Sequence, residues 1–156
     1  MKLTFATEQA IAVVALMATQ EPEIALSSES IYQKLNLSKS YVQKLLRKLV
    51  VAKIITGATG NSGGFRLAKP LVTITLYDVF SAIEGKFISL SNSDLLENAF
   101  ANFGVQAKEG HEVIAKYFND ADQQWINYLK TISVDMIMGE VFGKGNPVVF
   151  HDWNQE

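Results

Sequence analysis

A glycine-rich stretch in the middle of the chain, GATGNSGG at residues 57–64, joins two short runs with the character of β-strands. The runs are residues 53–56 and 65–68, and Pro70 follows the second one. Glycine and asparagine adopt the backbone conformations that a hairpin loop requires, and proline ends a strand because it has no N–H donor. The sequence therefore predicts a two-stranded β-hairpin in a chain whose other patterns are helical.

Three helical patterns come before the hairpin, at residues 7–19, 28–35 and about 38–51. Thr7 and Ser28 are the expected N-caps of the first two, because their side-chain oxygens can accept the first backbone N–H groups. In the third pattern, Ser40 and Gln43 have the spacing of a capping box. Its apolar stripe, at spacings of three and four residues, is Val42, Leu45, Leu46, Leu49 and Val50.

The order of these elements favours one small architecture. Asn36 and Leu37 form a short turn between the second and third helices, so these helices can cross steeply and present the third one outward. Helix, short turn, helix and hairpin is the order of a winged helix-turn-helix. The expected fold class is mainly α with a small β-hairpin wing.

Charge is distributed unevenly along the chain, whose net charge is −2. Residues 1–76 hold nine Lys and Arg against four Asp and Glu (+5), and residues 77–156 hold five against twelve (−7). Between Glu29 and Asp78 there is no acidic residue, and the basic residues there are Lys34, Lys39, Lys44, Arg47, Lys48, Lys53, Arg66 and Lys69. Such a segment can be a solvated charged face or a surface that binds a polyanion, of which nucleic acid is the leading candidate.

The face of the third helix opposite its apolar stripe consists of Ser38, Lys39, Ser40, Tyr41, Gln43, Lys44, Arg47 and Lys48. A helix fits the major groove of double-stranded DNA, and the residues near its N-terminus reach base edges. Gln43 has the amide that can pair with an adenine edge. Lys44, Arg47 and Lys48 lie further along the helix and are expected to contact phosphates.

Two stretches of sequence indicate a particular family: LLRKLVVAKIITGATGNSGGFRLAK at residues 45–69 and ITLYDVFSAIEG at residues 74–85. Together with the N-terminal helix and SKSYVQKLL, they resemble the Rrf-two (Rrf2) family of bacterial winged-helix transcription regulators. The resemblance covers residues 1 to about 86 well and the remainder in layout. It implies a homodimer that binds a pseudo-palindromic operator, with the third helix in the major groove and the wing in the minor groove. By position, Ser38, Ser40, Tyr41 and Gln43 would read the major groove, Thr59, Gly60 and Asn61 would form the wing tip, and Arg66 and Lys69 would contact flanking phosphates.

The chain departs from this family in two places. Many members have Arg-Gly at the wing tip, where this sequence has Thr59-Gly60. Cluster-binding members place three cysteines after the fourth helix, and this chain contains no cysteine at all. Without a thiolate, an iron–sulfur cluster ligated as in those members is excluded, and we expect no cofactor. His111 and His151, forty residues apart, are expected to be surface or core residues and not metal ligands.

The acidic half is predicted to be helical and to hold the dimer together. Thr75 is the expected cap of a fourth helix, which ends at Gly85. Further helices are predicted at residues 94–118 and 121–142, the second being the longest uninterrupted pattern. Its stripe of Trp125, Tyr128, Leu129, Ile132 and Met136 is expected to pair with the same helix of a second copy, although it could pack on the chain's own winged domain. We therefore divide the chain into a DNA-binding domain, residues 1–86, and an effector and dimerisation region, residues 87–156.

Other classes of function fit the sequence less well. The glycine-rich stretch lacks the Gly-Lys-Ser/Thr of a phosphate-binding loop, and no catalytic spacing indicates an enzyme. A protein-docking module would have apolar residues on the outward face at 38–48, where this chain has polar and basic ones. The apolar run at residues 10–18 is shorter than the ~20 residues that span a membrane.

We expect a cytoplasmic, homodimeric transcriptional repressor controlled by a small ligand, a partner protein or its own abundance, and with no membrane partner. The aromatic residues Phe87, Phe100, Phe103, Tyr117 and Phe118 could line a ligand pocket or belong to a core.

Overall fold

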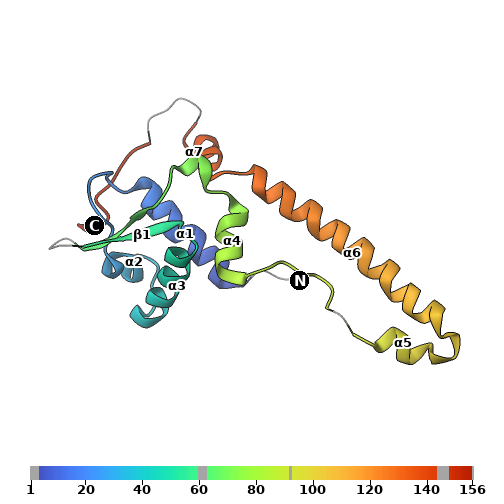
Figure 1. Ribbon diagram of the computed structural model, residues 1–156. Helices are drawn as coiled ribbons and strands as arrows, with labels where there is room; N and C mark the ends of the chain where they lie inside the picture. Colours follow the sequence, from blue (N-terminus) through green and yellow to red (C-terminus); the bar gives the residue numbers. More distant parts are fainter. Residues whose placement is uncertain (1–3, 60–62, 92, 144–147, 156) are drawn as a thin grey trace. The chain divides into compact units, whose positions relative to one another are not determined.

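A computed structural model of the chain describes residues 4–59, 63–91, 93–143 and 148–155. The chain separates into two compact units, which Figure 1 shows with the labels used below. The winged-helix unit consists of Lys2–Gly85 together with Leu129–Glu156, and the helical unit is Lys86–Tyr128. The C-terminal part of the chain thus belongs to the same unit as its N-terminal half. The described residues contain no helix with the length and apolar character needed to cross a membrane.

The first helix begins earlier than predicted. α1 spans Phe5–Thr19, and its N-cap position is Thr4, not Thr7. Thr7 is buried, and its hydroxyl donates a hydrogen bond of 2.6 Å to the carboxylate of Glu84. The threonine is therefore used in a tertiary contact between α1 and the end of the fourth helix, which local capping rules do not reveal.

The second and third helices are capped by the serines that directly precede them. α2 spans Ser28–Lys34, and α3 spans Lys39–Val51. Ser27 accepts a hydrogen bond from the N–H of Ser30, and Ser38 accepts one from the N–H of Tyr41. The predicted caps Ser28 and Ser40 were each wrong by one or two residues, because both lie inside the first turn. The turn between the helices was predicted correctly, and Asn36 adopts a positive φ of 51° there.

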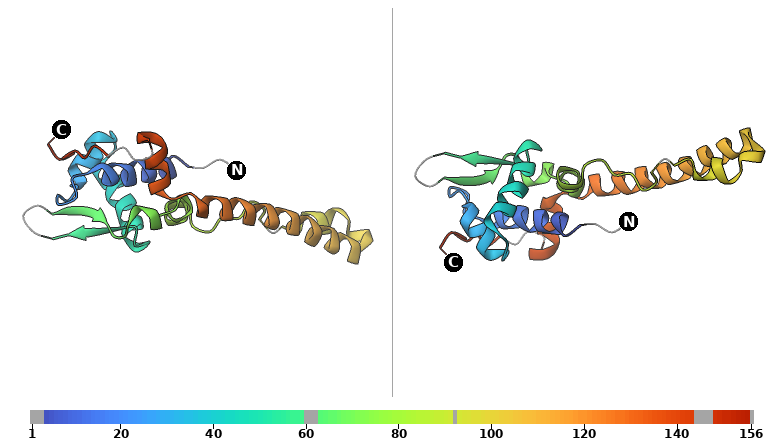
Figure 2. Two further views of the ribbon diagram at one scale, coloured as in Figure 1. Left: turned by 90° about the horizontal axis from the view of Figure 1, so that it is seen from above. Right: turned by 90° about the horizontal axis from the view of Figure 1, so that it is seen from below.

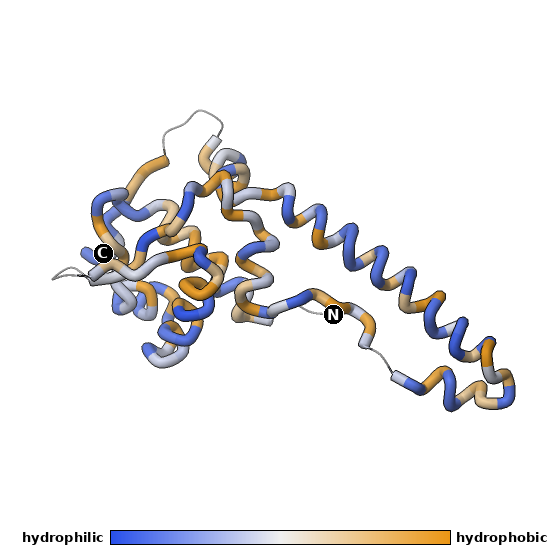
Figure 3. The backbone as a smooth tube through the Cα atoms, viewed as in Figure 1, coloured by the Kyte–Doolittle hydropathy of each residue, from blue (hydrophilic) through white to orange (hydrophobic). Residues whose placement is uncertain are grey.

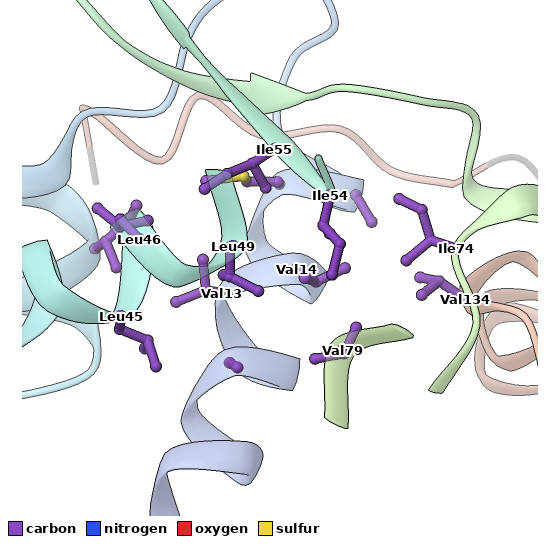
Figure 4. Close-up of a cluster of buried hydrophobic side chains, with 14 of the residues drawn as sticks. Val13, Val14, Leu45, Leu46, Leu49, Ile54, Ile55, Ile74, Val79 and Val134 are labelled. Carbon is purple, nitrogen blue, oxygen red and sulfur yellow. The ribbon is translucent and has the colours of Figure 1, made fainter. Parts of the chain in front are cut away.

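The core of the winged-helix unit is formed by apolar side chains from α1, α3, the hairpin and α4. Figure 4 shows Val13 and Val14 of α1 beside Leu46 and Leu49 of α3. The predicted stripe on α3 is confirmed for Val42, Leu45, Leu46 and Leu49, which are all buried. Val50 is 37% exposed and lies outside this stripe. Burying each large apolar side chain contributes about 1.5–3 kcal/mol, so this shared stripe stabilises α3 against α1.

The predicted hairpin is present, with its first strand shifted along the sequence. β1 spans Ile55–Ala58 and β2 spans Gly64–Leu67, paired antiparallel with Ile55 opposite Leu67. Figure 2 shows the two strands side by side. Lys53 has a φ of 56° and ends the preceding turn, so the strand cannot begin there. At the other end, a Cβ on Gly64 would lie 2.6 Å from the carbonyl oxygen of Leu26, so only glycine allows this approach.

A short 3-10 helix, η1 at Leu71–Thr73, leads to α4 at Leu76–Glu84. Thr75 caps α4 as predicted, and the capping box is complete: the N–H of Asp78 donates to the Thr75 hydroxyl, and the N–H of Thr75 donates to the Asp78 carboxylate. Gly85 ends α4 with a φ of 81°, the conformation that favours glycine at this position.

The helical unit differs from the predicted pattern. α5 is short, at Leu95–Ala99, a 3-10 turn (η2) follows at Ala101–Phe103, and α6 then runs without a break over Val105–Thr131. The helices predicted at 94–118 and 121–142 are therefore wrong in their boundaries. Gly104, with a φ of 53°, separates η2 from α6, and nothing interrupts the chain near residue 120.

The chain after α6 rejoins the winged-helix unit through backbone hydrogen bonds. The N–H of Leu76 donates to the carbonyl of Ile132, and the N–H of Val134 donates to the carbonyl of Ile74. These bonds replace helical ones and end α6, and Ser133 then caps α7, which spans Val134–Phe142. The 121–142 segment is thus two helices and not one.

Residues 148–155, the C-terminal tail, pack on the end of α1 and the start of α2. His151 forms a parallel bridge with Gln20, and its N–H donates to the carbonyl of Thr19. Asn154 accepts a hydrogen bond of 2.9 Å from the N–H of Ser27, at the N-terminus of α2. The tail therefore supplies a donor at the C-terminal end of α1 and an acceptor at the N-terminus of α2, where a helix cannot satisfy these groups itself.

Candidate nucleic-acid interface

α3 separates apolar and polar side chains cleanly between its two faces. Its apolar stripe is buried against the core, and this orientation turns Lys39, Ser40, Gln43, Lys44 and Arg47 outward, where all five are exposed. Side chains at spacings of three and four residues share one face of a helix, so these residues form one surface. The surface offers amide, hydroxyl and cationic groups, which are the groups that bind base edges and phosphates.

Two predicted residues near the start of α3 have structural roles as well. The hydroxyl of Ser38 is the N-cap acceptor of α3, and it also lies 3.4 Å from the hydroxyl of Ser40. Tyr41 is half-buried, and its hydroxyl donates a hydrogen bond of 2.7 Å to the side-chain oxygen of Gln9 on α1. Gln9 was not predicted, since its position on the first helix gives no local sign of a partner 32 residues away. These contacts fix the N-terminal turn of α3, where a recognition helix contacts bases.

Lys48 lies at the other end of the same surface and is tied to α4. Its Nζ donates a hydrogen bond of 2.7 Å to the carbonyl of Ile83. Lys44, Arg47 and Lys48 also line a cavity of about 430 Å³ between α3 and α4. The three cations predicted to contact phosphates thus line one cavity, from the middle of α3 towards its C-terminal end.

The wing contributes a second, smaller set of groups. Thr59 is exposed directly after β1, whereas Gly60 and Asn61 lie outside the described residues. Arg66, on β2, is exposed, and its guanidinium donates to the carbonyls of Glu23, at 2.5 Å, and Pro22, at 3.4 Å. The arginine is therefore held at the base of the wing by backbone groups.

Few carboxylates neutralise this positive surface. Among the described residues the one ion pair within 4.0 Å joins Lys69 to Asp78, at 3.5 Å. Glu84, beyond the basic segment, accepts hydrogen bonds from the hydroxyls of Thr4 and Thr7. These bonds, the one from Thr4 first, lower the pKa of Glu84 below its ordinary value. No described carboxylate lies within 4.0 Å of a basic side chain of α3, and the charge of Lys48 contributes to the lowered pKa of Glu84.

The residues predicted to form a dimer stripe do not share one helix. Trp125, Tyr128 and Leu129 lie on α6, Ile132 lies at the break, and Met136 lies on α7. Trp125 stacks on Phe87 within the helical unit, with ring centroids 4.3 Å apart. The prediction of a single continuous stripe was therefore wrong, because the backbone bonds of residues 132 and 134 end the helix.

A different apolar surface is present on α6, formed by Val113, Ile114, Tyr117 and Phe118. These side chains are 53%, 40%, 68% and 45% exposed, and they pair at spacings of four residues along one face. Tyr128, also exposed, lies about three turns after Tyr117 on the same face. In Figure 3, apolar and polar segments alternate along α6, as expected for an amphipathic helix. We call Val113, Ile114, Tyr117 and Phe118 the α6 surface.

The predicted aromatic pocket is partly present in the helical unit. Phe100 and Phe103 line a cavity of about 370 Å³, together with Leu96 and the first turns of α6. Of the other predicted members, Phe87 stacks on Trp125, and Tyr117 and Phe118 belong to the α6 surface.

The donor atoms of this chain do not suit an iron–sulfur cluster. Such clusters are held by cysteine thiolates, and the sequence has no cysteine. Within the described parts of the chain, no three His, Asp or Glu side chains gather as a metal site. His151 stacks on Trp153 in the C-terminal tail, with ring centroids 4.7 Å apart.

A helix-turn-helix with an exposed polar recognition helix, followed by a two-stranded wing, defines a winged helix-turn-helix protein. Sequence comparison places the chain more narrowly: residues 3–140 match the Rrf2 family, described as an iron-dependent transcriptional regulator, and the chain belongs to this family. The fold and the family resemblance predicted from the sequence are thereby confirmed.

Relatives and solved structures agree with this assignment. The chain is 36% identical over 141 residues to YwgB of Bacillus subtilis (strain 168), covering 90% of this chain and 86% of the relative. It is 28% identical over 156 residues to YffB of Lactococcus lactis (strain IL1403), covering 100% and 99%. Each relative carries the name "Putative HTH-type transcriptional regulator".

Two solved structures share the fold. CymR, titled the global cysteine regulator of B. subtilis, superposes with a TM-score of 0.63 at 20% identity, covering 88% of this chain and 95% of CymR. IscR of T. potens superposes with a TM-score of 0.65 at 18% identity, covering 94% and 93%. The chain is thus a transcriptional regulator of the Rrf2 family with the winged-helix fold of these proteins.

Proposed function

We propose that the protein is a homodimeric, sequence-specific DNA-binding repressor of the bacterial cytoplasm that works without an iron–sulfur cluster. The observation that carries this proposal is the outward face of α3, which is polar and basic over its whole length and has no ion pair with a described carboxylate. A docking module would instead need apolar side chains on that face. Family membership makes DNA the expected polyanion.

The α3 surface divides into a part that reads bases and a part that binds phosphates. Gln43 is exposed one turn into the helix and carries the bidentate amide that suits an adenine edge. Lys44 is exposed beside it and carries a point charge, which suits phosphate. Arg47 and Lys48, further along, extend the phosphate-binding part.

Binding to double-stranded DNA with a preferred sequence is the central test. Random duplexes captured by the purified protein should be enriched in a two-fold pseudo-palindrome. If each subunit neutralises about four phosphates, the affinity should fall with salt at a log–log slope of roughly −7. Uniform binding without an enriched site would contradict sequence-specific recognition.

Two neighbouring substitutions separate base reading from phosphate binding. Gln43→Ala should reduce the preference for the enriched site by about 1–3 kcal/mol and leave binding to random DNA unchanged. Lys44→Ala should weaken both alike and reduce the salt slope by about 1 for each phosphate that the lysine no longer neutralises. Equal losses on specific and random DNA for Gln43→Ala would refute its assignment to base reading.

A two-fold operator requires two recognition helices about 34 Å apart, which a dimer supplies. We place the dimer contact on the α6 surface, because four exposed apolar side chains on one helix face favour burial. Tyr128 and Trp125 lie on the same side of α6 and would extend this contact. Leu129, Ile132 and Met136 remain predicted participants from the other unit.

The mode of action follows from occupancy of a promoter. A dimer that covers its operator excludes RNA polymerase from an overlapping promoter, so we assign repression. Transcription in vitro from a promoter carrying the enriched site should fall as protein is added. An increase would assign activation instead.

Control by a thiolate-ligated cluster is excluded for a chain without cysteine. The signal is therefore a small molecule, a partner protein or the abundance of the protein. Protein purified without oxygen should have no visible absorbance from a cluster, and a stoichiometric iron–sulfur signal would refute this part of the proposal.

A further inference from the structure

A cavity of about 420 Å³ lies inside the winged-helix unit, at the base of the wing. Its walls come from four segments: the C-terminal end of α1, the connection between α1 and α2, the β2 and η1 region, and the C-terminal tail. Its volume falls in the range of small-molecule sites, which is about 300–1,000 Å³. Neither the α3 surface nor the α6 surface contributes a residue to it.

Most of the lining of this cavity is apolar. Met17 and Ala18 of α1 form its buried part, while Leu71 of η1 is half-buried at its side. Phe150 of the tail completes the lining and is still 46% exposed. A ligand that removes apolar surface of this kind from water lowers the free energy of the complex.

The lining of the cavity includes a positioned cation. Arg66 lines it, and the carbonyls of Pro22 and Glu23 hold the guanidinium in place. These two carbonyls accept hydrogen bonds from two of the five N–H groups of the guanidinium. Because a carbonyl has no formal charge, the positive charge of Arg66 is not neutralised by them. Glu21 also lines the cavity, yet no described carboxylate, Glu21 included, lies within 4.0 Å of Arg66.

We propose that this cavity binds a small monocarboxylate with an apolar body. The carboxylate pairs with the remaining N–H groups of Arg66, a geometry in which guanidinium and carboxylate form two parallel hydrogen bonds. The apolar body occupies the space between Met17, Leu71 and Phe150. The ligand class follows from these two features together, a cation held in place by two carbonyls and an otherwise mostly apolar lining.

Binding at this place would affect the wing. Arg66 belongs to β2, and its charge is predicted to attract flanking phosphates. A bound carboxylate neutralises that charge in each subunit, so DNA affinity should fall and the salt slope should decrease by about 1.8 for a dimer. This consequence rests on the proposed function, whereas the binding of the carboxylate does not.

The direct test uses hexanoate as the probe and the full chain with its methyl groups observed by NMR. Hexanoate should give saturable shifts at the methyls of Met17 and Leu71. Hexan-1-ol, hexylamine and acetate at the same concentrations should bind at least tenfold more weakly, since each lacks either the anion or the apolar body. Equal affinity for hexan-1-ol or hexylamine, or shifts that do not saturate, would overturn the proposal.

Three substitutions test the location of the site. Leu71→Trp should fill the cavity and abolish hexanoate binding, while Val72→Trp, at the neighbouring position that is 63% exposed and outside the lining, should leave it unchanged. Phe150→Ala removes an exposed wall without disturbing the core and should weaken binding at least threefold, which keeps the test decisive if Leu71→Trp misfolds. Unaltered binding in Phe150→Ala, or equal loss in Val72→Trp, would refute this location.

Measuring DNA affinity in parallel distinguishes the two proposals. Hexanoate binding by a protein that binds no DNA would refute the proposed function and leave the cavity assignment intact. DNA binding by a protein on which hexanoate gives no saturable shift would refute the cavity assignment and leave the proposed function intact.

Discussion

The winged-helix unit and the helical unit use their apolar residues in opposite ways. In the winged-helix unit, apolar side chains from α1, α2, α3, β1, α4 and α7 are buried in one core. In the helical unit, the buried apolar residues among those described are Ala107 and Ile126, while Val113, Tyr117 and Phe118 are exposed. The first unit has the core that an independently stable domain needs, and the second leaves apolar side chains exposed on the α6 surface, where we propose the dimer contact.

The largest effect should come from the core of the winged-helix unit. Leu49 is fully buried, and Leu49→Ala should lower the free energy of unfolding by about 2–5 kcal/mol, through reduced burial and the cavity left behind. Val51→Ala, on the same helix at a position that is 75% exposed, should change it by less than about 0.5 kcal/mol. Denaturant unfolding at one protein concentration measures both, and similar losses would contradict the core described here.

The helical unit should respond through association. Phe118→Glu places a charge on the α6 surface and should weaken the dimer by about 10- to 100-fold, as a desolvated charge costs on the order of 1.4–3 kcal/mol. Sedimentation velocity over a concentration series measures the dissociation constant. Asn119→Glu makes the same substitution at the adjacent exposed position and should leave the dimer intact. If both variants dissociate equally, net charge and not the α6 surface is responsible.

These two units were also predictable to different degrees. On α3, four of the five predicted stripe residues are buried. Apolar residues at helical spacing fall on one face of a helix, and that face packs against the core. Thr75 was predicted correctly as the cap of α4, since its partner Asp78 lies three residues away. Residue spacing therefore predicted these features correctly where the interacting residues lie within a few positions of one another.

Predictions that depended on distant partners were wrong. The break at Ile132 and Ser133 results from backbone bonds to Ile74 and Leu76, more than fifty residues away, which no helical period indicates. Thr7 was predicted as a cap from its position before the first helical pattern. Its hydrogen-bond partner is Glu84, 77 residues away, which local sequence does not indicate. For the candidate site, the exposed face of α3 followed from the same stripe, whereas the cavity at Arg66 depends on four separated segments and could not be predicted.

A smaller loss of stability is expected when the capping box at the N-terminus of α4 is removed. Thr75→Ala should lower the free energy of unfolding by about 1 kcal/mol, because the N–H of Asp78 loses its acceptor. Thr73→Ala removes an exposed hydroxyl that only donates to the carbonyl of Pro70, so its cost should be a few tenths of that. Equal costs in denaturant unfolding would show that the cap does not stabilise α4.

The smallest effect concerns the C-terminal tail of the winged-helix unit, which contacts α1 and α2 partly through polar groups. The hydrogen bond from the Gln20 side chain, opposed in part by burial, lowers the pKa of Asp152 below its ordinary value. Because the pKa of Asp152 is lower in the folded state, its contribution to the stability of the folded state is complete above the unfolded pKa and is lost as pH falls through the folded pKa.

Below about pH 4, the NMR signal of the Trp153 indole N–H, which donates to Thr19, should therefore move with pH. Asp152→Asn should remove this movement. A movement that persists in Asp152→Asn would assign the titration to another group and show that the tail is held independently of this carboxylate.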